Sequence, residues 1–235
     1  MTLLSAPRLD VPLVTAEADL LAAPGFVDRD AVGGGGSGTL VFSDRFDEAS
    51  TTYLENHTPN VGTAWYWNND GDWSSASAWN LQIVAGSGEA SLRSGSTNAG
   101  HYIPESQSAD LDITAVFETD HTGTGEALIY FRSLLAERTG YSFGLRSGDR
   151  LSLDHWTTTT PTNLYESTDL STGVPITARL QIIGTAIKLW LTDIEDTDTP
   201  VYDDTDSTHA GPDYVHAFCS GFGGCVIQDL IVREL

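Results

Sequence analysis

The chain has 235 residues, a length that suits one large domain with an appendage. Its formal net charge is −22, from 33 acidic and 11 basic residues, so the basic face that DNA or RNA binding needs is excluded and anionic membranes are disfavoured. No stretch approaches the roughly 18 apolar residues of a spanning helix, and we expect no membrane insertion. Lys188 is the only lysine. Such an acidic, lysine-poor surface is typical of halophilic proteins, with a GC-rich genome and selection for solubility as the alternative.

The first 32 residues differ in composition from the rest. They contain three prolines and one helix-capable stretch, TAEADLLAA at 15–23, which is too little to form a core. The run GGGGSG at 33–38 has the composition of a flexible linker. No basic region followed by an apolar core opens the chain, so a secretory signal is not indicated. We therefore predict an anchoring arm at 1–32, a linker at 33–38 and one domain at 39–235.

The predicted domain is all-β. A first strand runs from Thr39 into a turn, an aromatic-rich irregular segment covers 51–80, a hairpin covers 79–94, and a short strand covers 101–104. Seven later segments place apolar residues at every second position, which is the pattern of a half-buried strand. They are 110–118, 127–133, 141–147, 150–156, 178–184, 187–193 and 225–235. Ten or more short strands fit a two-sheet antiparallel jelly-roll sandwich.

Two cysteines, Cys219 and Cys225, flank the glycine-rich turn CSGFGGC. A gap of five residues rich in glycine can bring the two sulfurs together, so we predict a disulfide that closes this hairpin. The alternative is a pair of small buried residues that stay reduced. Without matched histidines, the two cysteines are weak evidence for zinc.

The aromatic-rich loop AWYWNNDGDW at 64–73 is the best candidate binding surface. Aromatic faces stack on the C–H faces of sugar rings, while carboxamides and carboxylates bond to hydroxyls. The predicted sugar-binding residues of this loop are Trp65, Trp67, Asn68, Asp70 and Trp73. The alternative is that both tryptophans of W-x-W belong to one buried sheet face. Trp156 and Tyr165, which flank a threonine-rich loop, form a second candidate platform with the same alternative.

Several of these segments resemble the concanavalin A-like lectin/glucanase superfamily, and its laminin-G-type jelly rolls in particular. The resemblance rests on FRS at 131–133, YSF at 141–143, the closing QDL at 228–230, and the opening FSDRFDEASTTYLENHTPNVGTAW at 42–65. That opening is similar to the start of such domains in phage and archaeal-virus structural proteins. The resemblance covers 39–235. It implies the fold and one structural calcium ion, with Asp44 and Asp229 as ligands. The acidic loop 193–206 is an alternative calcium site, and a solvated acidic loop is the simpler interpretation of it.

The sequence does not predict catalysis. Glucanases of this superfamily carry an E-x-D-x-x-E run that puts two carboxylates on one strand face. Asp110, Asp112 and Glu118 have the wrong spacing for it. No GxSxG, HExxH or Walker motif occurs. The six histidines are scattered along the chain: His57, His101, His121, His155, His209 and His216.

These features together favour a non-enzymatic virion structural protein: a capsid decoration, head fibre or tail appendage. The arm at 1–32 would contact other virion proteins, and an oligomer would present the sandwich to host-surface glycans with avidity. We expect the protein at the virion surface, made in the host cytoplasm without a signal peptide. A carbohydrate-binding module of a secreted protein and a degenerate glucanase-like hydrolase are the alternatives.

Overall fold

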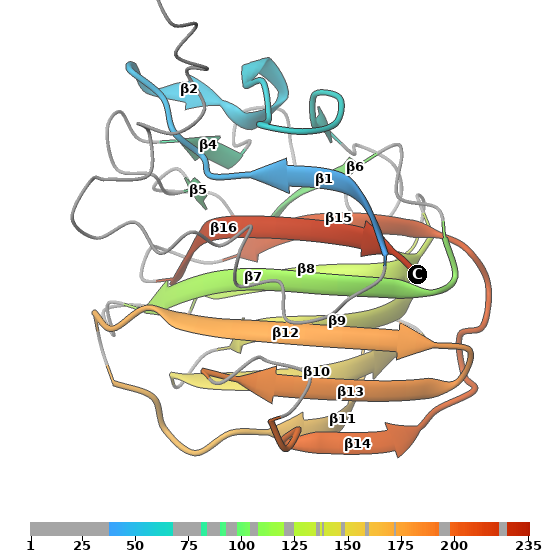
Figure 1. Ribbon diagram of the computed structural model, residues 1–235. Helices are drawn as coiled ribbons and strands as arrows, with labels where there is room; N and C mark the ends of the chain where they lie inside the picture. The colour runs from blue at the N-terminus through green and yellow to red at the C-terminus, as the bar shows by residue number, and fades with distance from the viewer. Residues whose placement is uncertain are drawn as a thin grey trace, which may run out of the picture. The chain divides into compact units, whose positions relative to one another are not determined.

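The computed structural model describes most of the chain from Gly38 onward (Figure 1). The described residues are 38–67, 81–83, 90–92, 98–103, 108–119, 125–134, 137, 139–146, 149–157, 160–171, 173–192, 198–220 and 225–235. The predicted arm at 1–32 and all of the predicted linker except Gly38 lie outside these residues, so both stay predictions.

The described residues are all β apart from one 3-10 turn, η1 at Leu54–Asn56. A nine-stranded sheet follows the order β14 (Tyr202–Thr205), β13 (Ala186–Leu191), β12 (Ile176–Ile183), β7 (Leu111–Thr119), β16 (Cys225–Glu234), β5 (Ala90–Leu92), β4 (Leu81–Ile83) and β2 (Thr52–Tyr53), with β1 (Thr39–Asp44) also paired to β16. A seven-stranded sheet follows the order β11 (Pro161–Glu166), β10 (Arg150–Trp156), β9 (Gly140–Arg146), β8 (Glu126–Ser133), β15 (Tyr214–Ser220), β6 (Asn98–Ile103) and β3 (Tyr66–Trp67).

The two sheets lie face to face, with β16, β7 and β12 of one in front of β15, β8 and β9 of the other in Figure 1. The pairings within the described residues are antiparallel, so the predicted jelly-roll sandwich is confirmed. The seven predicted strands are β7, β8, β9, β10, β12, β13 and β16. The predicted hairpin is also present, since Leu81 of β4 pairs with Leu92 of β5.

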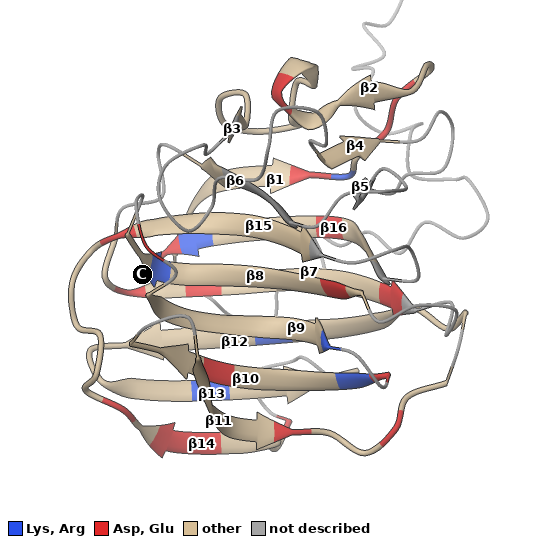
Figure 2. Cartoon of the chain, turned by 180° about the vertical axis from the view of Figure 1, so that it is seen from behind, with Lys and Arg blue, Asp and Glu red and all other residues tan. Residues whose placement is uncertain are grey.

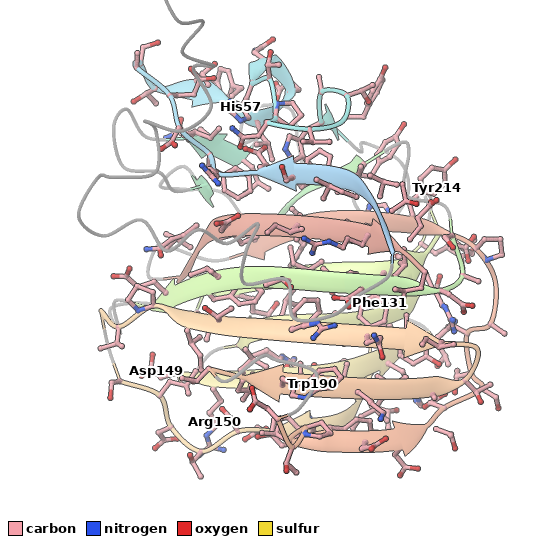
Figure 3. All side chains as sticks on the ribbon, in the orientation of Figure 1. His57, Phe131, Asp149, Arg150, Trp190 and Tyr214 are labelled. Atoms are coloured by element: carbon pink, nitrogen blue, oxygen red, sulfur yellow. The ribbon has the colours of Figure 1, made fainter. Side chains whose placement is uncertain are left out.

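Period-two alternation builds the core between the sheets. On β8, Ile129 and Phe131 point inward and are fully buried. Phe131, labelled in Figure 3, stacks on Tyr141 with ring centroids 5.4 Å apart. Phe117 of the larger sheet meets Phe143 of the smaller one edge-on at 5.8 Å. The contact between Phe117 and Phe143 joins the two layers, whereas Phe131 and Tyr141 are paired within the smaller sheet.

One buried arginine ties connecting segments to the smaller sheet. Arg132, at the end of β8, is 1% exposed. Its Nε donates to the carbonyl of Ala109 at 2.7 Å and its Nη1 donates to the carbonyl of His209 at 2.9 Å. Two connections that lead into different strands are therefore held at one end of the sandwich.

No helix in the described part of the chain is long and apolar enough to span a bilayer.

Candidate functional site

The outer face of the seven-stranded sheet is the candidate site, because it carries buried polar and aromatic side chains that point away from the main core. Figure 2 looks onto this sheet and shows acidic residues mostly at strand ends and connections. The residues that alternate with the core positions form a second apolar cluster. Its members are Leu128, Tyr130, Trp156 and Phe218. Polar groups on this face therefore sit beside an apolar floor rather than in open water.

A network of five polar residues lies on this face, and we call it the Asp154 cluster. Its members are Glu126, Arg146, Ser152, Asp154 and Asn163. Asp154 accepts hydrogen bonds from Ser152 Oγ at 2.7 Å and from Asn163 Nδ2 at 3.0 Å. Arg146 Nη1 lies 3.6 Å from Asp154 Oδ2, and Arg146 Nε donates to Glu126 at 3.2 Å. One guanidinium thus joins two carboxylates that come from β8 and β10.

The carboxylate at the centre of this cluster is completely shielded from solvent. Asp154 is 0% exposed, and burial raises its pKa above the ordinary value, while the bonds from Ser152 and Asn163 act in the opposite direction. Asn163 also donates to the carbonyl of Tyr165 at 2.9 Å. Because its amide hydrogens serve the protein, the amide oxygen is what this exposed residue can offer to a ligand hydroxyl.

Trp156 forms the apolar side of the cluster. Its Nε1 donates to Ser142 Oγ at 2.8 Å, and the Arg146 Cζ lies 5.9 Å from its ring centroid. Gly144 lies between Ser142 and Arg146 on β9 with a φ of +144°, and a Cβ added there would clash with the carbonyl oxygen of Ala127 on β8, so this position needs glycine. Trp156 is 4% exposed, so it fixes the arginine and does not offer an open ring face.

Three tyrosines form a second feature on the same outer face, and we call them the tyrosine row. Tyr66 of β3, Tyr102 of β6 and Tyr214 of β15 come from adjacent strands. Tyr66 is 52% exposed, and the other two are half-buried. The row lies on the same face as the Asp154 cluster but toward the other edge of the sheet, since β15 and β8 separate β6 from β9.

A third polar group, around Asp44, lies inside the fold. Trp65 Nε1 donates to Asp44 Oδ2 at 2.6 Å, and the backbone N–H of Phe46 donates to Asp44 Oδ1 at 2.8 Å. His57, labelled in Figure 3, places Nε2 at 2.7 Å from Asp44 Oδ1 and Nδ1 at 2.6 Å from Glu48 Oε1. An ionised carboxylate only accepts hydrogen bonds, so both ring nitrogens donate and the imidazole carries a positive charge.

The pKa of His57 follows from these contacts. Burial lowers it, and the hydrogen bonds and charges of Asp44 and Glu48 outweigh burial, so that the net shift is upward. His57 is 4% exposed and Asp44 is 0% exposed. The group is therefore a mostly buried hydrogen-bond network that joins β1, η1 and the segment before β3, with Glu48 as its partly exposed member.

No family model and no curated protein sequence matches the chain, but solved structures share its architecture. Carbohydrate-binding module CBM66 from Bacillus subtilis is 16% identical, with a TM-score of 0.55 over 72% of this chain and 95% of that one. The Ca²⁺-bound VIP36 exoplasmic/lumenal domain is 14% identical, with a TM-score of 0.51 over 72% of this chain and 88% of that one. The CBM2 module of the evolved Dit protein of Lactobacillus casei BL23 phage J-1 is 13% identical, with a TM-score of 0.50 over 83% of this chain and 95% of that one.

The chain has the concanavalin A-like jelly-roll fold. Two stacked antiparallel sheets and the matches to the CBM66 and VIP36 structures agree on this point. The fold predicted from the sequence resemblance is confirmed. Identities this low show the fold alone, so the function has to be argued from the outer face of the sheet.

In this concanavalin A-like sandwich Trp65 belongs to the core. It is 2% exposed, and its ring packs edge-on against Phe42 with centroids 4.9 Å apart. Of the two alternatives for W-x-W, the structure shows the buried sheet face for Trp65, which has no ring face open to a sugar. Trp67 pairs through its backbone with His101, and its side chain lies outside the described residues. The predictions for Asn68, Asp70 and Trp73 also fall outside them.

Trp156 and Tyr165 do not form one platform. Leu153 of the core pairs directly with Tyr165, so Tyr165 points to the core side of the sheet, where it packs against the main cluster. Trp156 lies in the outer cluster. Directly paired residues share a face and alternate residues reverse it, so the two rings lie on opposite sides of the sheet and the joint platform is corrected.

Asp44 and Asp229 do not converge on a calcium ion. Asp44 pairs directly with Leu230, so its side chain shares the core face with that residue, and neighbouring Asp229 points to the other face. Both oxygens of Asp44 already accept hydrogen bonds. The described residues hold no group of three or more His, Cys, Asp or Glu side chains suited to a metal. The residues do not fit the implied ion, although VIP36 was solved in a Ca²⁺-bound form.

The remaining predictions concern segments that the structure describes in part. Within the alternative acidic site at 193–206, residues 193–197 are outside the described range, and Asp206 accepts hydrogen bonds from Tyr141 at 3.0 Å and from His155 Nδ1 at 2.8 Å. Cys219 is buried on β15. The side chain of Cys225 is not described, so the disulfide stays a prediction.

Sequence reasoning missed both the Asp154 cluster and the tyrosine row. Alternation in 141–147 and 150–156 already placed Arg146, Asp154 and Trp156 on the side opposite the core, which was a usable signal. Nothing in the sequence connected Tyr66, Tyr102 and Tyr214, because only the pairing of β3, β6 and β15 brings them together.

Proposed function

We propose that this chain is a non-enzymatic glycan-binding module whose ligand contacts the outer face of the seven-stranded sheet. The Asp154 cluster is the observation that carries this proposal. It joins a buried carboxylate, a guanidinium and a carboxamide beside an indole. Sugar hydroxyls both donate and accept hydrogen bonds, and sugar C–H faces prefer apolar or aromatic contacts. The exposed Asn163 and the partly exposed Arg146 and Glu126 can meet the first requirement, while the buried Asp154 and Trp156 hold these groups in place.

The same contacts argue against hydrolysis. Glycoside hydrolysis needs one carboxylic acid and one carboxylate with separate roles on either side of the scissile bond. Here a single guanidinium contacts both Glu126 and Asp154, so the two carboxyl groups share one partner and do not stand apart on either side of a substrate. Asp154 also accepts bonds from Ser152 and Asn163. We expect no release of reducing ends when the protein is incubated with a polysaccharide that it binds.

The test uses the exposed member of the cluster. Asn163→Ala removes one hydrogen bond to Asp154 and the amide oxygen offered to a ligand, so we expect glycan affinity to fall about tenfold. Thr162→Ala is the matched control, because Thr162 is the exposed neighbour on the same strand and pairs with His155. A glycan array followed by isothermal titration measures both variants. Equal affinities for the two variants would remove the Asp154 cluster as the binding site.

For the biological setting we propose a virion appendage, with the arm at 1–32 docked on other virion proteins and the sandwich facing outward. Support comes from the arm and glycine-rich run in the sequence and from the likeness to a module of a phage Dit protein. Several linked copies would raise weak glycan contacts to useful avidity. A carbohydrate-binding module of a secreted protein is the second candidate, favoured by the match over 95% of CBM66.

Light scattering separates these two settings. The virion proposal predicts that the full chain forms oligomers and that a chain beginning at Thr39, the first residue of β1, is a monomer of unchanged melting temperature. If both chains are monomers that bind the same glycan, the arm is not an anchor and the secreted-module alternative replaces the virion proposal.

A further inference from the structure

We propose that the tyrosine row is a second saccharide-binding site, which seats one ring of an uncharged polysaccharide at the β3–β6–β15 edge of the outer face. The inference rests on the proposed glycan-binding function and adds both a place and a ligand class to it. It depends on Tyr66, Tyr102 and Tyr214, none of which belongs to the Asp154 cluster.

The three rings pack against one another at this edge of the sheet. Tyr66 and Tyr102 lie 5.6 Å apart between centroids with an interplanar angle of 34°, so their faces turn in similar directions. Tyr214 lies 5.3 Å from Tyr102 at 72° and stands nearly upright beside it. Figure 3 shows Tyr214 at the end of the sandwich where β15 begins. A sugar ring bound here would contact the exposed Tyr66 and lie beside Tyr102 and Tyr214.

Two rings of the row pack against a buried histidine on the same face of the sheet. Tyr102 and Tyr214 both contact His216, with centroids 5.8 and 6.3 Å away, and His216 is 0% exposed. Burial lowers the pKa of His216 to about 3, so this neighbour of the row is neutral above that pH. Aromatic rings that are already fixed lose little conformational entropy when a ligand binds.

The exposure of the row points to a ligand that is both polar and apolar. Tyr66 keeps 52% of its surface accessible and presents a ring face together with a hydroxyl. Tyrosine suits surfaces that are partly wet, because its body is apolar and its tip is polar. A saccharide has the same dual character, whereas a purely apolar partner would leave the hydroxyls without water or a hydrogen bond.

The charge of the chain selects among saccharides. With 33 acidic and 11 basic residues, the protein repels uronate, sialate and phosphate-bearing polymers over the range set by the ionic strength. Neutral polymers are not subject to this electrostatic repulsion. The ligand class is therefore an uncharged polysaccharide with a C–H face on its sugar rings.

The two sites are too far apart for one sugar ring. Four strand spacings separate β6 from β10 in the order of the sheet, which is about 19 Å at the usual spacing. A monosaccharide can occupy one site only, whereas separate segments of a long chain can occupy both. Tyr66 is therefore expected to matter more for polymers than for short oligosaccharides.

Affinity electrophoresis of the full chain tests the proposal. The gels contain dextran, mixed-linkage β-glucan or galactomannan as neutral polymers, and alginate or polygalacturonate as anionic ones. We expect retardation by at least one neutral polymer and by neither anionic one. Tyr66→Ala should weaken that retardation about fivefold to tenfold, and Tyr66→Trp should retain it. Ile183→Ala is the control, because Ile183 is 49% exposed on β12 of the other sheet.

Each other outcome has a definite meaning. If a neutral polymer retards the wild type and Asn163→Ala weakens it while Tyr66→Ala does not, the tyrosine row is overturned and the proposed function stands. Stronger retardation by alginate or polygalacturonate overturns the ligand class. If no glycan of the array or the gels binds the wild type, the proposed function itself fails, and this inference fails with it.

Discussion

We expect Arg179→Met to lower the free energy of unfolding by about 3–5 kcal/mol, because it leaves a buried carboxylate without its charged partner. Arg179 is 4% exposed and Asp112 is 2% exposed. Arg179 Nε donates to Asp112 Oδ1 at 3.0 Å and Nη2 donates to Oδ2 at 2.5 Å. The guanidinium also lies 5.2 Å from the ring centroid of Trp190, which Figure 3 shows on β13. Chemical denaturation of both proteins measures the difference.

A double variant separates the net contribution of the ion pair to stability from the destabilisation caused by leaving one buried charge unpaired. Replacing both residues, as Arg179→Met with Asp112→Leu, should recover most of the lost stability, since no buried charge then remains. Arg150→Met is the control, because Arg150 also contacts two carboxylates, of Glu166 and Asp169, but is exposed and should leave the melting temperature unchanged. A large loss that persists in the double variant would show that packing, not the unpaired charge, is responsible.

Asp44→Asn should cost about 3 kcal/mol or more, because a single buried carboxylate accepts charge-assisted hydrogen bonds from both His57 and Trp65. An amide of the same shape cannot accept from every donor that Asp44 serves. Asp47→Asn is the control, since Asp47 is the exposed acid three residues along the chain. The loss should be equal in EDTA and in millimolar Ca²⁺. A loss seen only with Ca²⁺ would make Asp44 a calcium ligand after all.

The same variant should change how stability depends on pH. The pKa of His57 is raised in the folded state, so its stabilising contribution is complete below the ordinary histidine pKa of about 6.5 and disappears as pH rises through the folded value. His216 acts in the opposite direction. Because its folded pKa is about 3, stability falls as pH drops below the ordinary value. We expect Asp44→Asn to flatten the alkaline limb and leave the acid limb intact.

The fold could be predicted because alternation is a local signal. In β12, the core positions Ala178, Leu180 and Ile182 recur every second residue. This alternation alone is enough to predict a strand at these residues. The strand β15 was not predicted. Its outward residues Tyr214, His216 and Phe218 are aromatic, as core residues often are, while its inward residues include the small Ala217 and Cys219. Hydrophobicity therefore did not alternate. β11 begins with Pro161 at a sheet edge, where the strand signal is weak.

The site could be predicted less well, because it depends on pairing. The bulge between Leu153 and Asp154 shifts the register of β11, so that Asn163 pairs with Asp154. No sequence pattern predicts that shift. Trp65 shows that a residue type alone can also predict a binding site where the structure has none. Its type suggested sugar stacking, and only the position of Asp44, 21 residues earlier, made the indole a buried hydrogen-bond donor.

Hydrogen exchange of the full chain, with and without a neutral glycan selected on the array, tests the central claim most directly. Binding to the outer face of the seven-stranded sheet predicts added protection in β10 and β11, beside Asp154 and Asn163, and in β3 and β6, beside Tyr66 and Tyr102. Exchange in β12 and β13 of the other sheet should stay unchanged. Protection confined to β12 and β13 would contradict the account and move the binding surface to the opposite face of the sandwich.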